Sequence, residues 1–126
     1  MSRIAALALL VPEYDAGIAF FCDVMGFRLI EDLDQGDKRW VTVEPAGGGV
    51  RLVLARAEGA LERAAVGNQA GGRVWLFLET DDFARDHAWM VAAGVVFEAA
   101  PRHEMYGVVA VWRDPFGNRW DLIERR

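Results

Sequence analysis

The sequence predicts an α+β domain built from two similar halves, each with the order β-α-β-β-β. Two observations lead to this prediction. The same succession of apolar run, acidic turn and glycine-closed helical stretch occurs twice along the chain. The turns also match, because Glu44-Pro45-Ala46-Gly47 lies 70 residues before Asp114-Pro115-Phe116-Gly117. At 126 residues, 53% of them hydrophobic, the chain has the length of a single domain and enough apolar residues to form a core.

The first half covers about residues 3–56. The apolar run 4–11 predicts a strand, and the acidic turn 12–15 offers carboxylates to the free N–H groups at a helix start. Three further strands are predicted at 27–33, 39–44 and 50–56, separated by turns rich in glycine, aspartate and proline. Apolar residues at spacings of three and four predict the intervening helix, which Gly26 ends: Ile18, Phe21, Cys22 and Met25.

The second half, about residues 73–126, repeats this plan. A strand is predicted at 73–80, and the acidic pair Asp81-Asp82 then begins a helix that Gly94 ends. Further strands are predicted at 95–98, 106–112 and 119–124. Residues 57–72, rich in alanine and glycine, are the predicted linker. Since each four-stranded half leaves one apolar face uncovered, we expect the halves to pair and form a shared concave cleft, where function should lie.

Composition excludes several classes of function. The net charge is −5, and the chain has one lysine and no basic cluster, which excludes binding to nucleic acid phosphates. The longest apolar stretch, 4–12, is far shorter than the roughly 20 residues that span a bilayer. Cys22 is the only cysteine, so no intramolecular disulfide can form, as in proteins of a reducing compartment. We therefore expect a cytoplasmic protein with a small-molecule partner, without nucleic acid or membrane partners.

Several segments resemble the vicinal oxygen chelate superfamily, which includes glyoxalase-type lyases, fosfomycin-modifying enzymes, bleomycin-binding resistance proteins and extradiol dioxygenases. The resemblance covers nearly the whole chain, and it implies a glyoxalase-like fold of paired βαβββ modules, a half-open β-barrel cleft and a homodimer. The segments that carry it are 15–21, 25–27, 81–83, 93–95 and, most specifically, Asp114-Pro115-Phe116-Gly117-Asn118-Arg119-Trp120-Asp121-Leu122.

Metalloenzymes of this superfamily place a His, Glu or Gln ligand on the first and last strand of each module. Alignment on the turns puts Ala6, Arg51, Trp75 and Asp121 at these positions, so one of four ligands is kept. The expected cofactor is therefore none, without a family-type divalent metal. Two interpretations of Arg51 and Asp121 remain open. They form a structural ion pair, or they bind a ligand, with Arg51 holding an anionic group and Trp75 forming an apolar wall.

The weaker catalytic candidates are His103, Glu104 and Tyr106, which could transfer a proton on a bound carbonyl compound, although such residues are also common in a polar turn. His87 has the spacing of a helix-packing residue. The favoured function is binding of a small organic molecule without metal, as in the bleomycin-binding members. The alternatives are a metal-dependent or acid–base lyase or dioxygenase acting on a small carbonyl or aromatic compound, and a domain that pairs with another protein.

Overall fold

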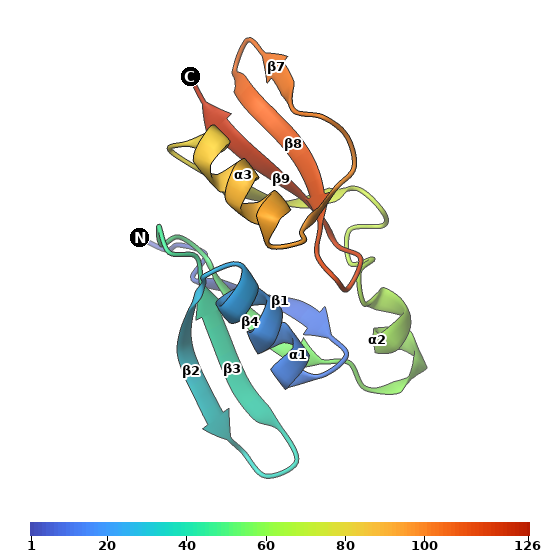
Figure 1. Cartoon of the computed structure of the whole chain (residues 1–126). Helices are drawn as coiled ribbons and strands as arrows, with labels where there is room; N and C mark the ends of the chain where they lie inside the picture. The colour runs from blue at the N-terminus through green and yellow to red at the C-terminus, as the bar shows by residue number, and fades with distance from the viewer. The chain divides into compact units, whose positions relative to one another are not determined.

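The computed structural model describes residues 1–126, which form two compact units, Met1–Val66 and Gly67–Arg126. Each unit contains one open mixed sheet with a helix on one face, which confirms the α+β class (Figure 1). The elements in chain order are β1 (Ala6–Val11), α1 (Tyr14–Ile18), η1 (Ala19–Val24), β2 (Arg28–Asp34), β3 (Arg39–Glu44), β4 (Arg51–Arg56), α2 (Gly59–Ala65), β5 (Val74–Glu79), α3 (Phe83–Ala92), β6 (Val96–Phe97), β7 (Arg102–Glu104), β8 (Gly107–Arg113) and β9 (Arg119–Arg125).

The two sheets share one topology. In the first, the strand order is β1-β4-β3-β2, and in the second it is β5-β9-β8-β6 with β7 also paired to β8. In both, the first and last long strands are parallel neighbours, β1 with β4 and β5 with β9, while the other pairs are antiparallel. Because parallel neighbours need a crossover connection, each helix crosses one face of its own sheet.

In the first unit, α1 packs closely against β1 and β4. A β-carbon added at Gly17 would lie 2.9 Å from Leu54 and 3.1 Å from Val11, so these two side chains face the helix. Leu54 and Val11 are buried there together with Phe21. Side chains alternate along a strand, so Arg51, Val53 and Ala55 of β4 lie on the face that α1 does not cover. We call this the open face of the first unit.

In the second unit, α3 lies beside β9 (Figure 1). The Phe83 N–H at the helix start donates a 2.8 Å hydrogen bond to Glu124, and Trp112 and Trp120 stack with ring centroids 4.7 Å apart. The indole of Trp120 and the side chain of Leu122 are buried on this side. Alternation then places Asp121 on the opposite face, which we call the open face of the second unit.

Three elements differ from the sequence predictions. The first helix is α-helical only to Ile18 and continues as the π-helical segment η1, in which the Met25 N–H bonds the carbonyl of Phe20, five residues back. The segment 57–72, predicted as a linker, holds the helix α2. The stretch between the predicted strands 95–98 and 106–112 contains a further strand, β7, which pairs with β8.

The helix ends follow the predicted chemistry in part. Asp82 caps α3 by accepting a 3.1 Å hydrogen bond from the Arg85 N–H, whereas Glu13 makes no side-chain cap at α1. Gly26 and Gly94 end the helical segments with positive φ angles of 72° and 88°. No helix in the chain has the length and apolar character needed to cross a membrane.

Candidate functional site

The predicted ligand-binding residues lie in two different units. Arg51 is on β4 of the first unit, whereas Trp75 on β5 and Asp121 on β9 belong to the second. Arg51 and Asp121 both lie on the open faces defined above. Each face is therefore described within its own unit, and the pairing of Arg51 with Asp121 stays a prediction.

One end of the first unit's open face is apolar. Leu33 of β2 and Trp40 of β3 are Cα partners, and they are 52% and 39% exposed. Val41 and Leu54 are the last Cα partners of β3 and β4, so continuing this register brings Ala55 next to Trp40, and Leu10 of β1 is the Cα partner of Ala55. A row of apolar side chains thus crosses the whole sheet, a surface on which a flat apolar molecule can lie.

The other end of this face is charged. The carboxylate of Glu44 lies between two guanidinium groups, 3.3 Å from Arg28 and 3.4 Å from Arg51. A good charge-assisted hydrogen bond between such groups measures about 2.7–2.9 Å, so the Arg51 guanidinium is held only loosely. Its side chain is 45% exposed, and it therefore remains able to bind an anionic group of a ligand.

Asp121 has a different environment. One of its carboxylate oxygens, Oδ1, is buried without a hydrogen-bond partner. Burial raises the pKa of Asp121, and the charges of Arg102 and Arg119 lower it by a smaller amount. Asp121 is thus a half-buried carboxylate whose hydrogen-bonding capacity the protein leaves unused.

The strand register changes the expected surroundings of Asp121. A bulge between Val74 and Leu76 makes Trp75 the extra residue of β5, and the Cα partner of Asp121 on β5 is Phe77. Trp75 is half-buried, whereas Phe77 is 64% exposed. Sequence reasoning missed Phe77 because alignment on turns assumes a regular strand, and nothing in the residues themselves marks the bulge.

The catalytic candidates do not form a cluster. His103 and Glu104 belong to β7, where Glu104 lies 3.5 Å from Arg102, and Tyr106 is 52% exposed in the turn that follows. Gly107, which follows Tyr106, is required by the fold, since its φ is +147° and a β-carbon there would overlap the carbonyl oxygen of Glu124. No hydrogen bond joins His103, Glu104 and Tyr106 to one another, as a proton relay would require.

His87, by contrast, lies where its spacing predicts. Its imidazole stacks on Phe83 with ring centroids 5.4 Å apart and lies 4.5 Å from the ring of Phe97. It is therefore a packing residue between α3 and the end of β6.

The turn 114–118, the first part of the most specific sequence signal 114–122, has a structural role. Asp114 is only 4% exposed, and its carboxylate accepts four hydrogen bonds. Oδ1 accepts from the backbone N–H groups of Phe116 and Asn118, both at 3.0 Å. Oδ2 accepts from the Asn118 amide at 2.8 Å and from the Trp120 indole at 3.0 Å. Asp114 is therefore the centre of the β8–β9 turn and has no capacity left for a ligand.

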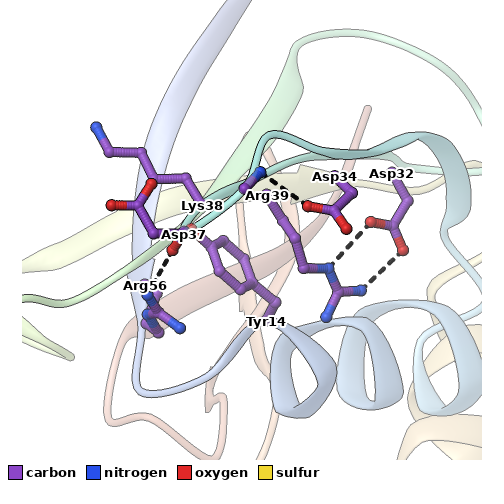
Figure 2. A pocket seen from close by; sticks show the side chains of 8 residues that line it. Tyr14, Asp32, Asp34, Asp37, Lys38, Arg39 and Arg56 are labelled. Atoms are coloured by element: carbon purple, nitrogen blue, oxygen red, sulfur yellow. Dashed lines mark hydrogen bonds and ion pairs between the residues drawn. The ribbon is translucent and has the colours of Figure 1, made fainter.

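A pocket of about 320 Å³ lies in the first unit, where the β2–β3 hairpin meets the start of α1. Figure 2 shows the Tyr14 ring between the side chains of Arg39 and Arg56, and each guanidinium carbon is 5.3 Å from the ring centroid. Arg39 also donates to Asp32 at 2.8 and 3.1 Å and to Asp15 at 2.8 Å.

These contacts change the acidity of the groups involved. The hydrogen bonds from Arg39 lower the pKa of Asp32, and those to Asp32 and Asp15 raise the pKa of Arg39. Arg56 donates in turn to the Asp37 carbonyl at 3.0 Å. The contacts of Arg39 and Arg56 therefore hold the hairpin against α1. Because both arginines already have partners, their guanidinium groups offer little to a ligand in this pocket. Its lining residues are Tyr14, Asp32, Asp34, Gly36, Asp37, Lys38, Arg39 and Arg56.

The donor set of the four strand positions does not fit a family-type metal centre. Ala6 and Arg51 are Cα partners on β1 and β4, and neither side chain can donate an electron pair to a divalent ion. Trp75 offers only an indole N–H. Neither unit contains a group of three or more His, Cys, Asp or Glu side chains arranged to hold an ion.

Comparison with solved structures shows the same architecture. TnmS3, an antibiotic binding protein from Streptomyces sp. CB03234, superposes with a TM-score of 0.80 at 26% identity, covering 100% of this chain and 98% of that one. A glyoxalase/bleomycin resistance protein from the same organism gives a TM-score of 0.74 at 27% identity over 96% and 99% of the two chains. A superfamily member from Sphaerobacter thermophilus DSM 20745 shares the fold at 20% identity, with a TM-score of 0.77 over 99% and 98% of the chains.

The sequence itself has a relative in Shewanella frigidimarina strain NCIMB 400, an uncharacterized protein that is 49% identical over 124 residues, 96% of this chain and 92% of the relative. The profile of the Glyoxalase/Bleomycin resistance protein/Dioxygenase superfamily matches residues 3–122. Because this match covers almost the whole sequence, the chain belongs to the Glyoxalase/Bleomycin resistance protein/Dioxygenase superfamily.

Proposed function

We propose that this protein binds a small organic molecule of the antibiotic type on its open sheet faces, without the divalent metal that metalloenzymes of the superfamily use. The observation that carries the proposal is the Ala6–Arg51 pair on adjacent strands, at two of the four metal-ligand positions. Ala6 offers no ligand atom and the permanent cation of Arg51 repels a metal ion, whereas the same guanidinium can bind an anionic ligand group. The similarity to an antibiotic binding protein supports the same function.

The surface chemistry also favours binding over catalysis. The open face of the first unit provides an apolar row that includes Trp40 and Leu33, with Arg51 at the far end. This combination suits a flat apolar molecule with an acidic or phenolic group. The candidate proton-transfer residues form no mutual hydrogen bonds, so an acid–base lyase is the weaker alternative.

Isothermal titration of metal-depleted protein tests the proposal. We would titrate bleomycin and a panel of aromatic polycyclic antibiotics into protein treated with chelator, and repeat the titrations after adding Zn²⁺, Mn²⁺ or Fe²⁺. Binding by at least one compound at equal affinity with and without metal is the expected result. Absence of binding across the panel, or binding that requires a metal, would contradict the proposal, and the second outcome would support the metal-dependent alternative.

Two pairs of variants locate the site. Arg51→Gln should lower the affinity for an acidic ligand by roughly tenfold or more, because a hydrogen bond to a charged group contributes about 1.5–3 kcal/mol. Arg63→Gln in α2, which removes an arginine outside the sheets, is its matched control. Trp75→Ala should weaken binding, whereas Trp89→Ala on the exposed side of α3 should not. Equal effects within both pairs would show that the ligand lies elsewhere.

The resemblance also implies a homodimer, and we propose that state for the protein in solution. Sedimentation equilibrium across a range of concentrations measures it directly. A single species with the 14.0 kDa mass of one chain would contradict it.

A further inference from the structure

The Asp121 carboxylate is a polar group that its own unit does not satisfy. Oδ1 is buried with no hydrogen-bond partner, and no ion pair of the second unit reaches the side chain. Leaving a buried acceptor unsatisfied costs about 1–3 kcal/mol, and more for a charged group. The residue as a whole is only half-buried, so part of Asp121 is exposed to solvent.

The side chains on either side of Asp121 are apolar. Its Cα partners are Phe77 on β5 and Val111 on β8. Partners in register point to the same side of a sheet, so both lie on the open face with Asp121. Phe77 is 64% exposed, so it presents apolar surface to solvent on the same face as Asp121.

The cations nearest to Asp121 have other partners. Arg119 donates to Glu98 at 2.7 and 2.8 Å and to the Gly72 carbonyl at 3.1 Å. Arg102 instead lies 3.5 Å from Glu104. These arginines act on Asp121 through their charge alone. The charged groups on or beside this face are Glu79 from β5, Glu98 after β6, Arg102 and Glu104 from β7, Arg113 from β8, and Arg119 and Arg125 from β9.

We propose that Asp121 and Phe77 form a recognition point for an aromatic amine, in which the Asp121 carboxylate accepts hydrogen bonds from the protonated amino group and the Phe77 ring packs against the aromatic part. This inference rests on the proposed function and deepens it by naming a ligand class. A cation is favoured over a neutral donor because it compensates the desolvated carboxylate in charge as well as in hydrogen bonding. The exposed ring supplies apolar contact next to that charge.

Three probes of one shape test the inference: 1-naphthylmethylamine, 1-naphthalenemethanol and 1-naphthoic acid. Titration into the whole chain, followed by calorimetry, should show the amine binding at least tenfold more tightly than the alcohol, and the acid more weakly than either. Asp121→Asn should abolish the preference for the amine while retaining binding of the alcohol. Phe77→Ala should weaken amine and alcohol alike. Glu79→Gln, a matched change of a carboxylate on the neighbouring strand, should leave the preference intact.

The pH dependence provides a second readout. Amine binding needs the ionised carboxylate, so affinity should rise as the pH rises through the pKa of Asp121 and then level off. Asp121→Asn should remove this dependence. Circular dichroism would check that the variant is folded, and its stability should equal or exceed that of the wild type because a desolvated charge has been removed.

The possible outcomes separate this inference from the proposed function. Equal affinity for amine and alcohol, or an amine preference that survives Asp121→Asn, overturns the inference. Absence of binding by all three probes also overturns it. If the antibiotic panel still binds without metal in either case, the proposed function stands. If the amine preference appears but no antibiotic binds, the inference stands and the ligand type of the proposed function is wrong.

Discussion

Replacing Asp114 with asparagine tests whether this carboxylate organises the β8–β9 turn. The amide oxygen of the variant can still accept from the backbone N–H groups of Phe116 and Asn118. Its NH₂ group, however, replaces Oδ2 and faces two donors. These are the Asn118 amide and the Trp120 indole, which lie 2.8 and 3.0 Å from Oδ2 in the wild type. Two hydrogen bonds to a buried charged acceptor are lost, each contributing about 1.5–3 kcal/mol. We expect the free energy of unfolding to fall by about 3 kcal/mol or more.

Urea unfolding measures this change. With an m-value of about 1–3 kcal/mol per molar urea, a loss of about 3 kcal/mol lowers the midpoint by roughly 1–3 M. Trp40 is the only tryptophan of the first unit, so a Trp40→Phe background makes indole fluorescence report on the second unit alone. Asp81→Asn, a change at a carboxylate whose side chain is 89% exposed, is the control and should leave the midpoint in place. If the midpoints of Asp114→Asn and the control coincide, Asp114 does not hold the turn.

Two further changes test other parts of the fold. Gly107→Ala should destabilise the second unit by about 2 kcal/mol or more, because the new β-carbon overlaps the Glu124 carbonyl at a positive φ. Gly94→Ala, in the same unit with φ +88° and no atom near the added β-carbon, should cost less in the same urea assay. Glu98→Gln should lower the melting temperature at pH 7. The hydrogen bond from Arg119 lowers the pKa of Glu98, so its contribution to stability is present above the unfolded pKa and disappears as the pH falls through the folded pKa. Melting curves at neutral and acidic pH should therefore converge for wild type and Glu98→Gln, and a difference that persists in acid would contradict this explanation.

The repeated order of elements could be predicted from the sequence because hydrophobic periodicity and turn chemistry are local signals. The strand predicted at 39–44 coincides with β3, and the predicted glycines end both helical segments. The signal is weaker where an element depends on its neighbours. The short strand β7 forms because its three residues find the edge of β8, and its polar sequence alone resembles a turn.

The candidate site was harder to predict from the sequence because it depends on strand register. A single bulge at Trp75 shifts the partner of Asp121 to Phe77, and the bulge leaves no mark in the pattern of residue types. Likewise, the sequence places Arg51 on a strand, but the choice of Glu44 as its ionic partner follows from the antiparallel pairing of β3 with β4. Residue type and position were thus predictable, whereas the identity of the neighbours was not.

Two aspartates seven residues apart illustrate why partners decide function here. Asp114 lies in the β8–β9 turn and Asp121 in β9 just after it, both within the segment 114–122, and residue type alone does not distinguish them. Asp114 accepts four hydrogen bonds and is used entirely by the fold, whereas Asp121 accepts none and has a buried oxygen. A carboxylate whose hydrogen bonds are all made stabilises one conformation. A buried carboxylate without hydrogen bonds is stabilised only when a further donor binds it. Within the segment that best identifies the family, Asp114 therefore builds the scaffold, whereas Asp121 is the carboxylate to which the inference above assigns ligand recognition.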